Sequence, residues 1–267
     1  MKRLLYFFIS LTVLAMACRN TPNPEASKPV DTIEMDETEG GMDFYLKKWK
    51  QGIDFYALGN EPFWSLDFEN KKVVRFTTAD GFEMNVPYKA FSPAENSELV
   101  FYSETEMGSL KIELTRERCE DNMSGTPFSH RVRILIETVD GGQSYEGCGR
   151  FVVTPDLNNS FQLVRWNKEN VDGEKIAKGA PVLDFDLATL RVSGHSGCNQ
   201  INSGFMPEPG VIYFSAMAST MMSCEGSMEF EQLYLQALSE GPHSFDVNNG
   251  RLVLGNANNK MTYELVD

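Results

Sequence analysis

A period of two runs through much of this sequence. Between residues 54 and 153, apolar and polar side chains alternate over short runs, as in Leu110, Ile112 and Leu114. Because successive side chains of a strand point to opposite faces of a sheet, this alternation predicts strands that bury one face. The expected strands cover residues 63–68, 73–77, 109–115 and 131–138. Turn sequences such as Asp80-Gly81 separate them, so this half is expected to be an antiparallel sheet curled into a sandwich or barrel.

The second half adds one helix to further strands. From Ser227 onward, apolar side chains recur at helical spacing, at Phe230, Leu233, Tyr234, Ala237 and Leu238. This stripe predicts an amphipathic helix that Ser227 caps and Gly241-Pro242 ends. Strands are expected at residues 161–166, 182–185, 190–194, 211–215, 218–224, 245–247, 252–254 and 261–265. The predicted fold class is mainly β with one helix (α+β), in two antiparallel, barrel-like domains.

The first 17 residues have the features of a secretory signal peptide. Lys2 and Arg3 precede a mostly apolar stretch of about 12 residues, which is too short to span a bilayer. The small residues directly before Cys18 resemble the lipobox of bacterial lipoproteins. That resemblance implies that Cys18 becomes the diacylated N-terminus of the mature chain. The alternative is an unlipidated secreted protein, because Ala15-Met16-Ala17 would also suit an ordinary secretory peptidase.

Residues 18–51 are expected to be a lipidated cysteine followed by an acidic, flexible tether. Three prolines and seven acidic residues lie between residues 19 and 43, and such a segment stays extended by charge repulsion. Its acids could alternatively bind cations or a basic partner. The whole chain carries a net charge of −14, which repels phosphate backbones and argues against nucleic-acid binding. Two domains are expected to follow, 52–157 and 160–267, on either side of a polar boundary.

Apart from Cys18, the chain has four cysteines, Cys119, Cys148, Cys198 and Cys224. An even number in an exported chain indicates disulfides. Three pairings are possible, and one disulfide in each domain is the simplest, which joins Cys119 to Cys148 and Cys198 to Cys224. The short cysteine or histidine spacings typical of zinc sites do not occur in the sequence, so no metal is expected at these thiols.

Two resemblances extend this description. The segments 59–64, 119–125 and 147–149 resemble an uncharacterised family of bacterial envelope domains that often precedes a META domain. The segments 163–166, 183–186, 193–199, 219–224 and 252–254 resemble the META domain family, which includes HslJ-type heat-shock lipoproteins. This second resemblance implies a small, mostly antiparallel β-fold with one packed helix. It also implies an envelope role linked to stress or antibiotic tolerance, without known enzymatic activity. His195 stands where that family more often has a small polar residue, so no role is carried over to it.

The resulting functional prediction is a cell-envelope lipoprotein that acts as a non-enzymatic binding or stress-protective module without a cofactor. Its partners would be a membrane, through the lipid anchor, and an envelope protein or a small-molecule ligand. Arg19, directly after Cys18, favours the outer membrane, on its periplasmic or surface face.

Two chemical alternatives remain. A hydrolase could use His130, His195 or His243, although no G-x-S-x-G motif occurs in the sequence. A Cu(I) site could use His195 with thioether sulfurs, although methionines beside an amphipathic helix usually fill a core. The methionines concerned are Met217, Met221, Met222 and Met228.

The anchor can be tested directly. A Cys18→Ser variant is expected to lose incorporation of radiolabelled palmitate and to leave the membrane fraction, because an uncleaved apolar segment of this length binds a bilayer weakly. A Ser10→Ala variant, which leaves the cysteine in place, should be labelled like the wild type. Unchanged labelling of Cys18→Ser would contradict the lipoprotein hypothesis.

Overall fold

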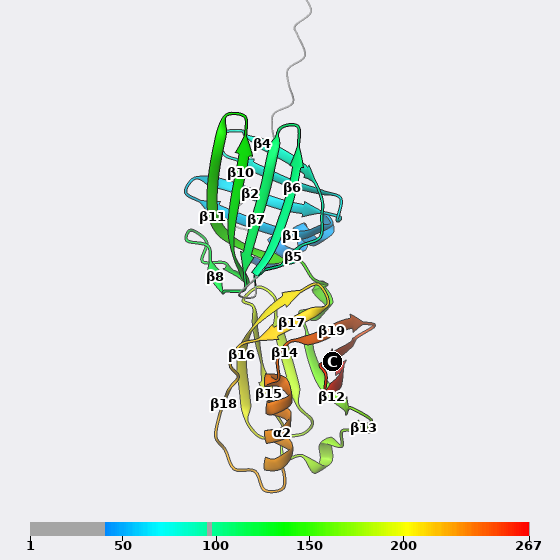
Figure 1. Ribbon diagram of the computed structural model, residues 1–267. Helices are drawn as coiled ribbons and strands as arrows, with labels where there is room; N and C mark the ends of the chain where they lie inside the picture. Colours follow the sequence, from blue (N-terminus) through cyan, green and yellow to red (C-terminus); the bar gives the residue numbers. More distant parts are fainter. Residues whose placement is uncertain (1–40, 95–97, 267) are drawn as a thin grey trace, which may run out of the picture. The chain divides into compact units, whose positions relative to one another are not determined.

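The computed structural model describes residues 41–94 and 98–266, and two large antiparallel sheets account for most of them (Figure 1). The predicted signal peptide and Cys18 lie outside the described residues. One sheet covers residues 53–151 and the other covers residues 160–265. The chain passes from the first to the second through the short 3-10 helix η2, Pro155–Leu157, close to the boundary expected from sequence. That each half folds by itself stays a prediction.

The nine strands of the first sheet run in the order β4-β3-β2-β1-β11-β10-β7-β6-β5. Their bounds are β1 Ile53–Asn60, β2 Phe63–Glu69, β3 Val73–Thr78, β4 Glu83–Pro87, β5 Ser92–Pro93, β6 Glu98–Thr105, β7 Gly108–Thr115, β10 His130–Thr138 and β11 Gly141–Phe151. All four strands predicted from alternation are present, as β2, β3, β7 and β10. A small hairpin of β8, Cys119–Glu120, and β9, Pro127–Phe128, lies between β7 and β10 in the chain.

Ten residues of the segment that was expected to be flexible are helical. Residues Gly41–Lys50 form a helix, α1, rather than flexible chain up to residue 51. Its Tyr45 is fully buried, and the Tyr45 hydroxyl and the Val153 backbone exchange hydrogen bonds, both of 2.7 Å. The guanidinium of Arg150 lies 4.6 Å above the Tyr45 ring. The acidic composition of the preceding residues concealed this helix, whose stability comes from packing rather than from local propensity.

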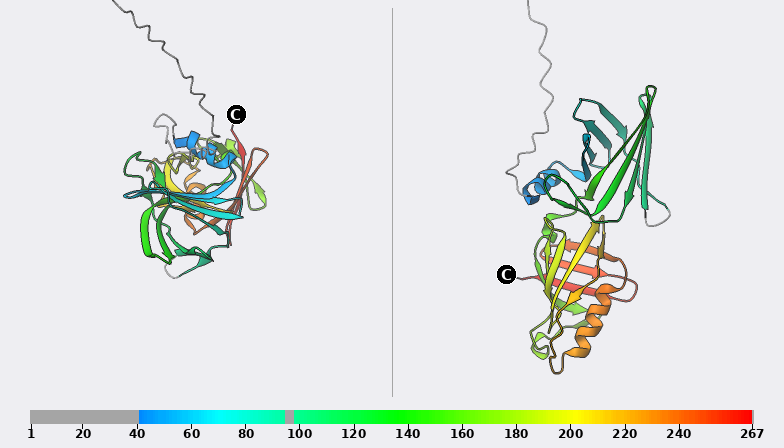
Figure 2. Two further views of the ribbon diagram at one scale, coloured as in Figure 1. Left: turned by 90° about the horizontal axis from the view of Figure 1, so that it is seen from above. Right: turned by 90° about the vertical axis from the view of Figure 1, so that its left-hand side faces the viewer.

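The second sheet closes into a barrel. Its strands are β12 Ser160–Trp166, β13 Glu169–Asn170, β14 Val182–Asp186, β15 Arg191–His195, β16 Gln200–Glu208, β17 Val211–Phe214, β18 Ala218–Ser219, β19 His243–Asn248, β20 Arg251–Gly255 and β21 Lys260–Leu265. The order β12-β14-β15-β16-β17-β19-β20-β21 returns to its start because β21 also pairs with β12. In Figure 2 the strands β19 to β21, coloured orange to red, lie side by side in the barrel wall.

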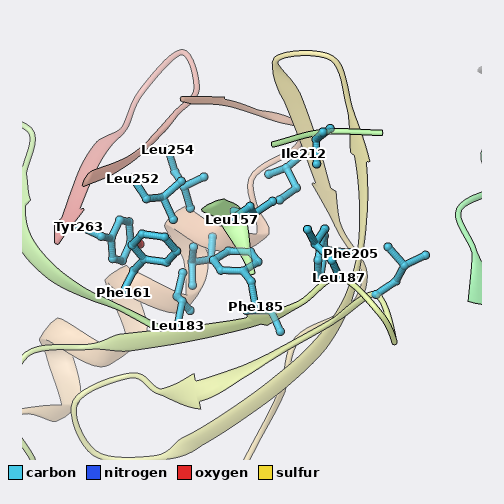
Figure 3. Close-up of a cluster of buried hydrophobic side chains, with 14 of the residues drawn as sticks. Leu157, Phe161, Leu183, Phe185, Leu187, Phe205, Ile212, Leu252, Leu254 and Tyr263 are labelled. Carbon is cyan, nitrogen blue, oxygen red and sulfur yellow. The ribbon is translucent and has the colours of Figure 1, made fainter. Parts of the chain in front are cut away.

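Large apolar side chains fill the barrel (Figure 3). Phe161 and Leu183 point inward from the first strands, and Leu252, Leu254 and Tyr263 point inward from the last two. Each of these side chains is fully buried. Since inward and outward positions alternate along a strand, the polar residues between them face out from the barrel wall.

The predicted helix is present as α2, Met228–Ser239, but two details differ from expectation. Ser227 makes no capping hydrogen bond; its hydroxyl instead accepts one from the backbone of Ala177 at 2.9 Å. Leu233 is 51% exposed, whereas Glu231 is only 3% exposed. The apolar stripe therefore predicted wrongly that Leu233 is buried. The buried face of α2 includes the hydrogen-bonded carboxylate of Glu231 instead.

Two further expectations are corrected. The segment 218–224 is a strand only at β18, and the backbone of residues 220–224 is irregular. The sequence around Pro62 and Trp64 suits an edge strand that caps a core, yet β2 lies between β1 and β3. Trp64 is buried there, and Pro62 lies in the turn before the strand, where no ladder hydrogen bond is needed.

Both predicted disulfides are present. Cys119 is bonded to Cys148, and Cys198 is bonded to Cys224, with Cα atoms 5.6 and 6.0 Å apart. Each disulfide lies within one half of the chain, and the paired cysteines are 29 and 26 positions apart in sequence. By chain-entropy reasoning, loops of this length stabilise the folded state by about 3.5 kcal/mol each.

Candidate functional site

The META-like motifs meet around one buried carboxylate. Glu231 of α2 accepts hydrogen bonds from the backbone N–H of Asn199 at 2.8 Å and from its side-chain amide at 2.7 Å. The hydroxyl of Ser196 donates a third hydrogen bond to the same carboxylate. Glu231 thereby holds the tight loop that follows β15 against the helix.

Asn199 extends this contact to the next motif. Its side-chain oxygen accepts hydrogen bonds from the Thr220 hydroxyl at 2.8 Å and from the Met222 backbone N–H at 2.6 Å. The Cys198–Cys224 disulfide joins the same two loops. The loop at residues 196–199 is therefore fastened both to residues 220–224 and to α2, and we call this set of contacts the Glu231 cluster.

Glu231 remains ionised despite its burial. Desolvation opposes the charged form, but the hydrogen bonds from Ser196 and Asn199 outweigh it, so the pKa of Glu231 lies below the ordinary value. A carboxylate whose oxygens are occupied in this way positions a loop. It is not available as a general base.

The methionines of the second motif do not fill the core. Met221 is 100% exposed, Met222 is 43% exposed and Met228 is 45% exposed, so the core interpretation is wrong for these three, whereas Met217 is partly buried against the core. The Met222 sulfur lies 4.0 Å from the ammonium nitrogen of Lys178. That positive charge disfavours a second cation at the same sulfur.

His195 is half-buried at the end of β15. Its Nδ1 accepts a hydrogen bond from the backbone N–H of Gly197 at 3.2 Å. Burial, followed by the nearby positive charge of Lys178, lowers the pKa of His195, which keeps the ring neutral at pH 7. Within residues 41–94 and 98–266, no group of three or more His, Cys, Asp or Glu side chains is arranged to hold a metal ion.

A hydroxyl, an imidazole and a carboxylate do lie in series inside the protein. The Ser129 Oγ is 2.9 Å from His130 Nδ1, and His130 Nε2 is 3.2 Å from Glu208 Oε1. Arg116 also pairs with Glu208 and stacks on the Tyr213 ring at 4.5 Å. Burial opposes ionisation of Glu208, but the hydrogen bonds from His130 and Arg116 outweigh it and place its pKa below the ordinary value.

This series has the residue types of a hydrolase triad without access for a substrate. Ser129 and His130 are both 0% exposed, so neither side chain reaches the surface. Glu208 belongs to β16, whereas Ser129 and His130 precede or begin β10. The arrangement is an interior hydrogen-bonded link between residues of the two sheets. His243, the third candidate, is also fully buried, and its Nε2 lies 3.1 Å from the Leu238 carbonyl.

The motifs of the first half also come together. Gly59 and Gly147 leave room for the Trp64 indole, since a Cβ at either glycine would lie within 2.7 Å of the Trp64 ring. The Trp64 indole N–H donates to the Glu146 carbonyl at 3.3 Å. Asp121 accepts hydrogen bonds from Asn60 and from the backbone and hydroxyl of Ser124. All these contacts are internally satisfied, which indicates a structural role.

The outer wall of the barrel carries a hollow of about 630 Å³ over β12, β20 and β21. Its floor is formed by half-buried Val164, Val253 and Thr262, and its rim carries Arg165, Arg251 and Lys260. We call these six residues the outer-face groove. A second hollow, toward β19, shares Arg251 and Val253 with it.

Sequence reasoning missed Glu231, Glu208 and the outer-face groove. A lone glutamate is usually solvated, so neither acid was predicted to be buried. The groove residues lie in three strands that become neighbours only when the barrel closes. The available signal for Glu231 was its place one residue after Phe230, inside the predicted buried arc.

A substitution tests the Glu231 cluster. We expect Glu231→Gln to lower the unfolding free energy by about 1 to 3 kcal/mol at pH 7, because the new amide NH₂ would face the donors of Asn199. Glu229→Gln, on the exposed side of the same helix, should change it by less than about 0.5 kcal/mol.

The pH dependence has a defined sign. Because the folded-state pKa of Glu231 is depressed, its stabilisation is present above the unfolded-state pKa of about 4.3 and is lost as pH falls through the folded value. Urea unfolding should therefore give the largest difference between wild type and Glu231→Gln near pH 7, with the difference narrowing below about pH 4. A difference independent of pH would contradict this assignment.

Comparison with known proteins agrees with the motifs of the second half. The family model described as the META domain matches residues 159–265. No curated protein matches the chain. A solved structure titled "NMR structure of the protein" is similar at 26% sequence identity, covers 42% of this chain and 95% of its own, and has a TM-score of 0.35. The resemblance of residues 52–157 to an uncharacterised envelope family stays a prediction. Residues 159–265 of this chain, which form the closed barrel with α2, are a META domain.

Proposed function

We propose that this META-domain protein is an exported lipoprotein of the bacterial cell envelope that acts as a binding module and not as an enzyme. The observation that carries the proposal is the pair of disulfides. Disulfides persist in oxidising compartments and are rare in the cytosol. Together with the signal peptide and lipobox at residues 1–18, they favour export.

The lipid on Cys18 would supply the membrane anchor, toward the outer membrane as Arg19 suggests. No helix in the described part of the chain is long and apolar enough to cross a membrane. A single acyl chain anchors weakly, whereas the two chains of a diacylglyceryl group hold a protein stably.

The binding role is supported by the outer-face groove. The barrel interior is packed with buried side chains, so ligand contacts are available on the outer wall. The groove offers cationic, amide and hydroxyl groups over a small apolar floor, which is the composition of a polar ligand site. A stress-protective role would follow if the ligand is an envelope component.

Export can be tested by trapping thiols in cells. In the full-length protein, acid quenching followed by a maleimide mass tag should leave Cys119, Cys148, Cys198 and Cys224 unmodified. A variant that begins at Arg19, and so stays in the cytoplasm, should take up four tags. Reduction before tagging is the control and should expose all four thiols in both proteins. Four free thiols in the full-length protein would contradict the proposal.

The enzyme alternative has its own test. We expect no labelling of Ser129 by a fluorophosphonate, because both its hydroxyl and the His130 ring are buried. Ser129→Ala should lower stability by about 1 kcal/mol through loss of the hydrogen bond to His130 and leave the labelling pattern unchanged. Stoichiometric labelling that Ser129→Ala removes would favour a hydrolase.

A further inference from the structure

A β-bulge builds the outer-face groove. In β12, Leu163 is opposite Tyr263 and Arg165 is opposite Thr262. Tyr263 and Thr262 are adjacent in β21, whereas Val164 lies between Leu163 and Arg165, so β12 has one extra residue here. Leu163 points into the barrel, and strict alternation would point Arg165 inward as well. The extra residue, Val164, shifts the alternation, so that Val164 and Arg165 both line the outer hollow.

The bulge has a second consequence, inside the barrel. Trp166, one residue later, packs edge-on against Phe230 and Tyr234 of α2, with ring centroids 5.8 and 6.1 Å away. The same register change that places an arginine outside therefore also places a tryptophan against the helix. Because the buried Leu163 and the packed Trp166 fix the backbone on both sides of Arg165, they also fix its outward orientation.

The registers of the last strands complete the groove. Arg165 lies opposite Thr262, and Thr262 lies opposite Val253, so these residues form one row across three strands. In the next row Lys260 faces Gly255, which has no side chain. Asn167, in the β12–β13 turn, and Asn170, in β13, add amide groups along one side.

The charge of the groove is opposite to that of the chain. Arg165, Arg251 and Lys260 face a single acid, Glu264, which lies 3.3 Å from Arg251. Among residues 41–94 and 98–266, neither Arg165 nor Lys260 forms an ion pair; Arg165 donates only to the Lys168 carbonyl at 3.4 Å. The whole chain has a net charge of −14. A surface with two unneutralised cations beside neutral amides therefore has a charge opposite to that of the protein as a whole.

We propose that the outer-face groove binds a saccharide unit that carries one carboxylate. The carboxylate would lie between Arg165 and Lys260, where it accepts charge-assisted hydrogen bonds. Hydroxyl and amide groups of the sugar would face Thr262, Asn167 and Asn170, and its apolar ring face would rest on Val164 and Val253. The ligand class rests on the proposed function, because acidic saccharides are components of a bacterial envelope.

An anionic membrane fits this groove less well. Binding to a lipid surface depends on several clustered cations that reach the bilayer, and the strongly negative chain is repelled by anionic lipids. The groove instead has two available cations, neutral polar groups and a size within the range of small-molecule sites.

The test compares two sugars that differ by one acidic group. The ¹⁵N-labelled chain from Arg19 to Asp267, purified in its disulfide-bonded form, is titrated with N-acetylmuramic acid and with N-acetylglucosamine, which lacks the lactyl carboxylate. The acidic sugar should shift amide signals in β12, β20 and β21 and bind at least about 10-fold more tightly than the neutral sugar. Its affinity should fall as salt is added.

Substitutions then assign the binding to the groove. Arg165→Gln and Lys260→Gln should each weaken binding of N-acetylmuramic acid by about 10-fold, whereas Arg165→Lys, which keeps the charge, should retain part of the affinity. Arg191→Gln is the matched control, since Arg191 is an exposed arginine of the same barrel in β15. It should bind like the wild type. A dispersed amide spectrum checks that each variant is folded.

The outcomes are separable. Equal responses to the two sugars, shifts outside β12, β20 and β21, or an equal loss in Arg191→Gln would overturn the proposal. Binding to phosphatidylglycerol vesicles without a response to N-acetylmuramic acid would also overturn it and favour a lipid surface. None of these results depends on where the protein resides, so a failed export test and a failed ligand test are distinguishable.

Discussion

The second half of the molecule depends on the pairing of its first strand with its last. β12 and β21 are about 100 residues apart in the chain, yet their hydrogen bonds remove both free edges of the sheet and close the barrel. Closure defines an inside, which Phe161, Leu183 and Tyr263 fill, and an outside, where the alternate positions face solvent. The bulge in β12 lies in this same pairing. The step that completes the core therefore also brings Arg165 and Lys260 to the same hollow and forms the outer-face groove.

Two buried carboxylates organise the contacts that strands alone do not make. Removing a charge from water is unfavourable unless hydrogen bonds replace the lost solvation. Glu231 meets this condition with donors from Ser196 and Asn199, and Glu208 meets it with His130 and Arg116. Each acid stays ionised while buried because segments distant in sequence supply its hydrogen bonds, so each one couples loop geometry to folding. This coupling explains why a hydroxyl, an imidazole and a carboxylate in series serve here as an interior link.

The distribution of polar groups separates the interior from the available surface. The hydrogen-bonding capacity of the motif residues is directed inward, into the Glu231 cluster and, in the first half, onto Asp121 and Trp64. Groups that could meet a ligand lie instead on the barrel wall, at positions that no short motif marks. The disulfides fasten loops at positions apart from that wall, so a rigid scaffold can present the groove without using its motif residues for binding.

Much of the local structure was determined by the sequence alone. Alternation identified strands such as β7 and β10, an apolar stripe identified α2, the even number of cysteines led to both disulfide pairs, and short motifs identified the META domain.

Local patterns failed where both faces of a strand are buried, as in β1, or where glycines replace apolar residues, as in β11. They also failed at α1, whose Tyr45 is held by Val153, more than 100 residues away. Only the tertiary structure decided that Glu231 is buried and Leu233 exposed, that the sheet closes, and that Arg165 faces outward. The reason is physical: periodicity records which side of an element avoids water, whereas the partner that neutralises a charge or shifts a register comes from a distant part of the chain.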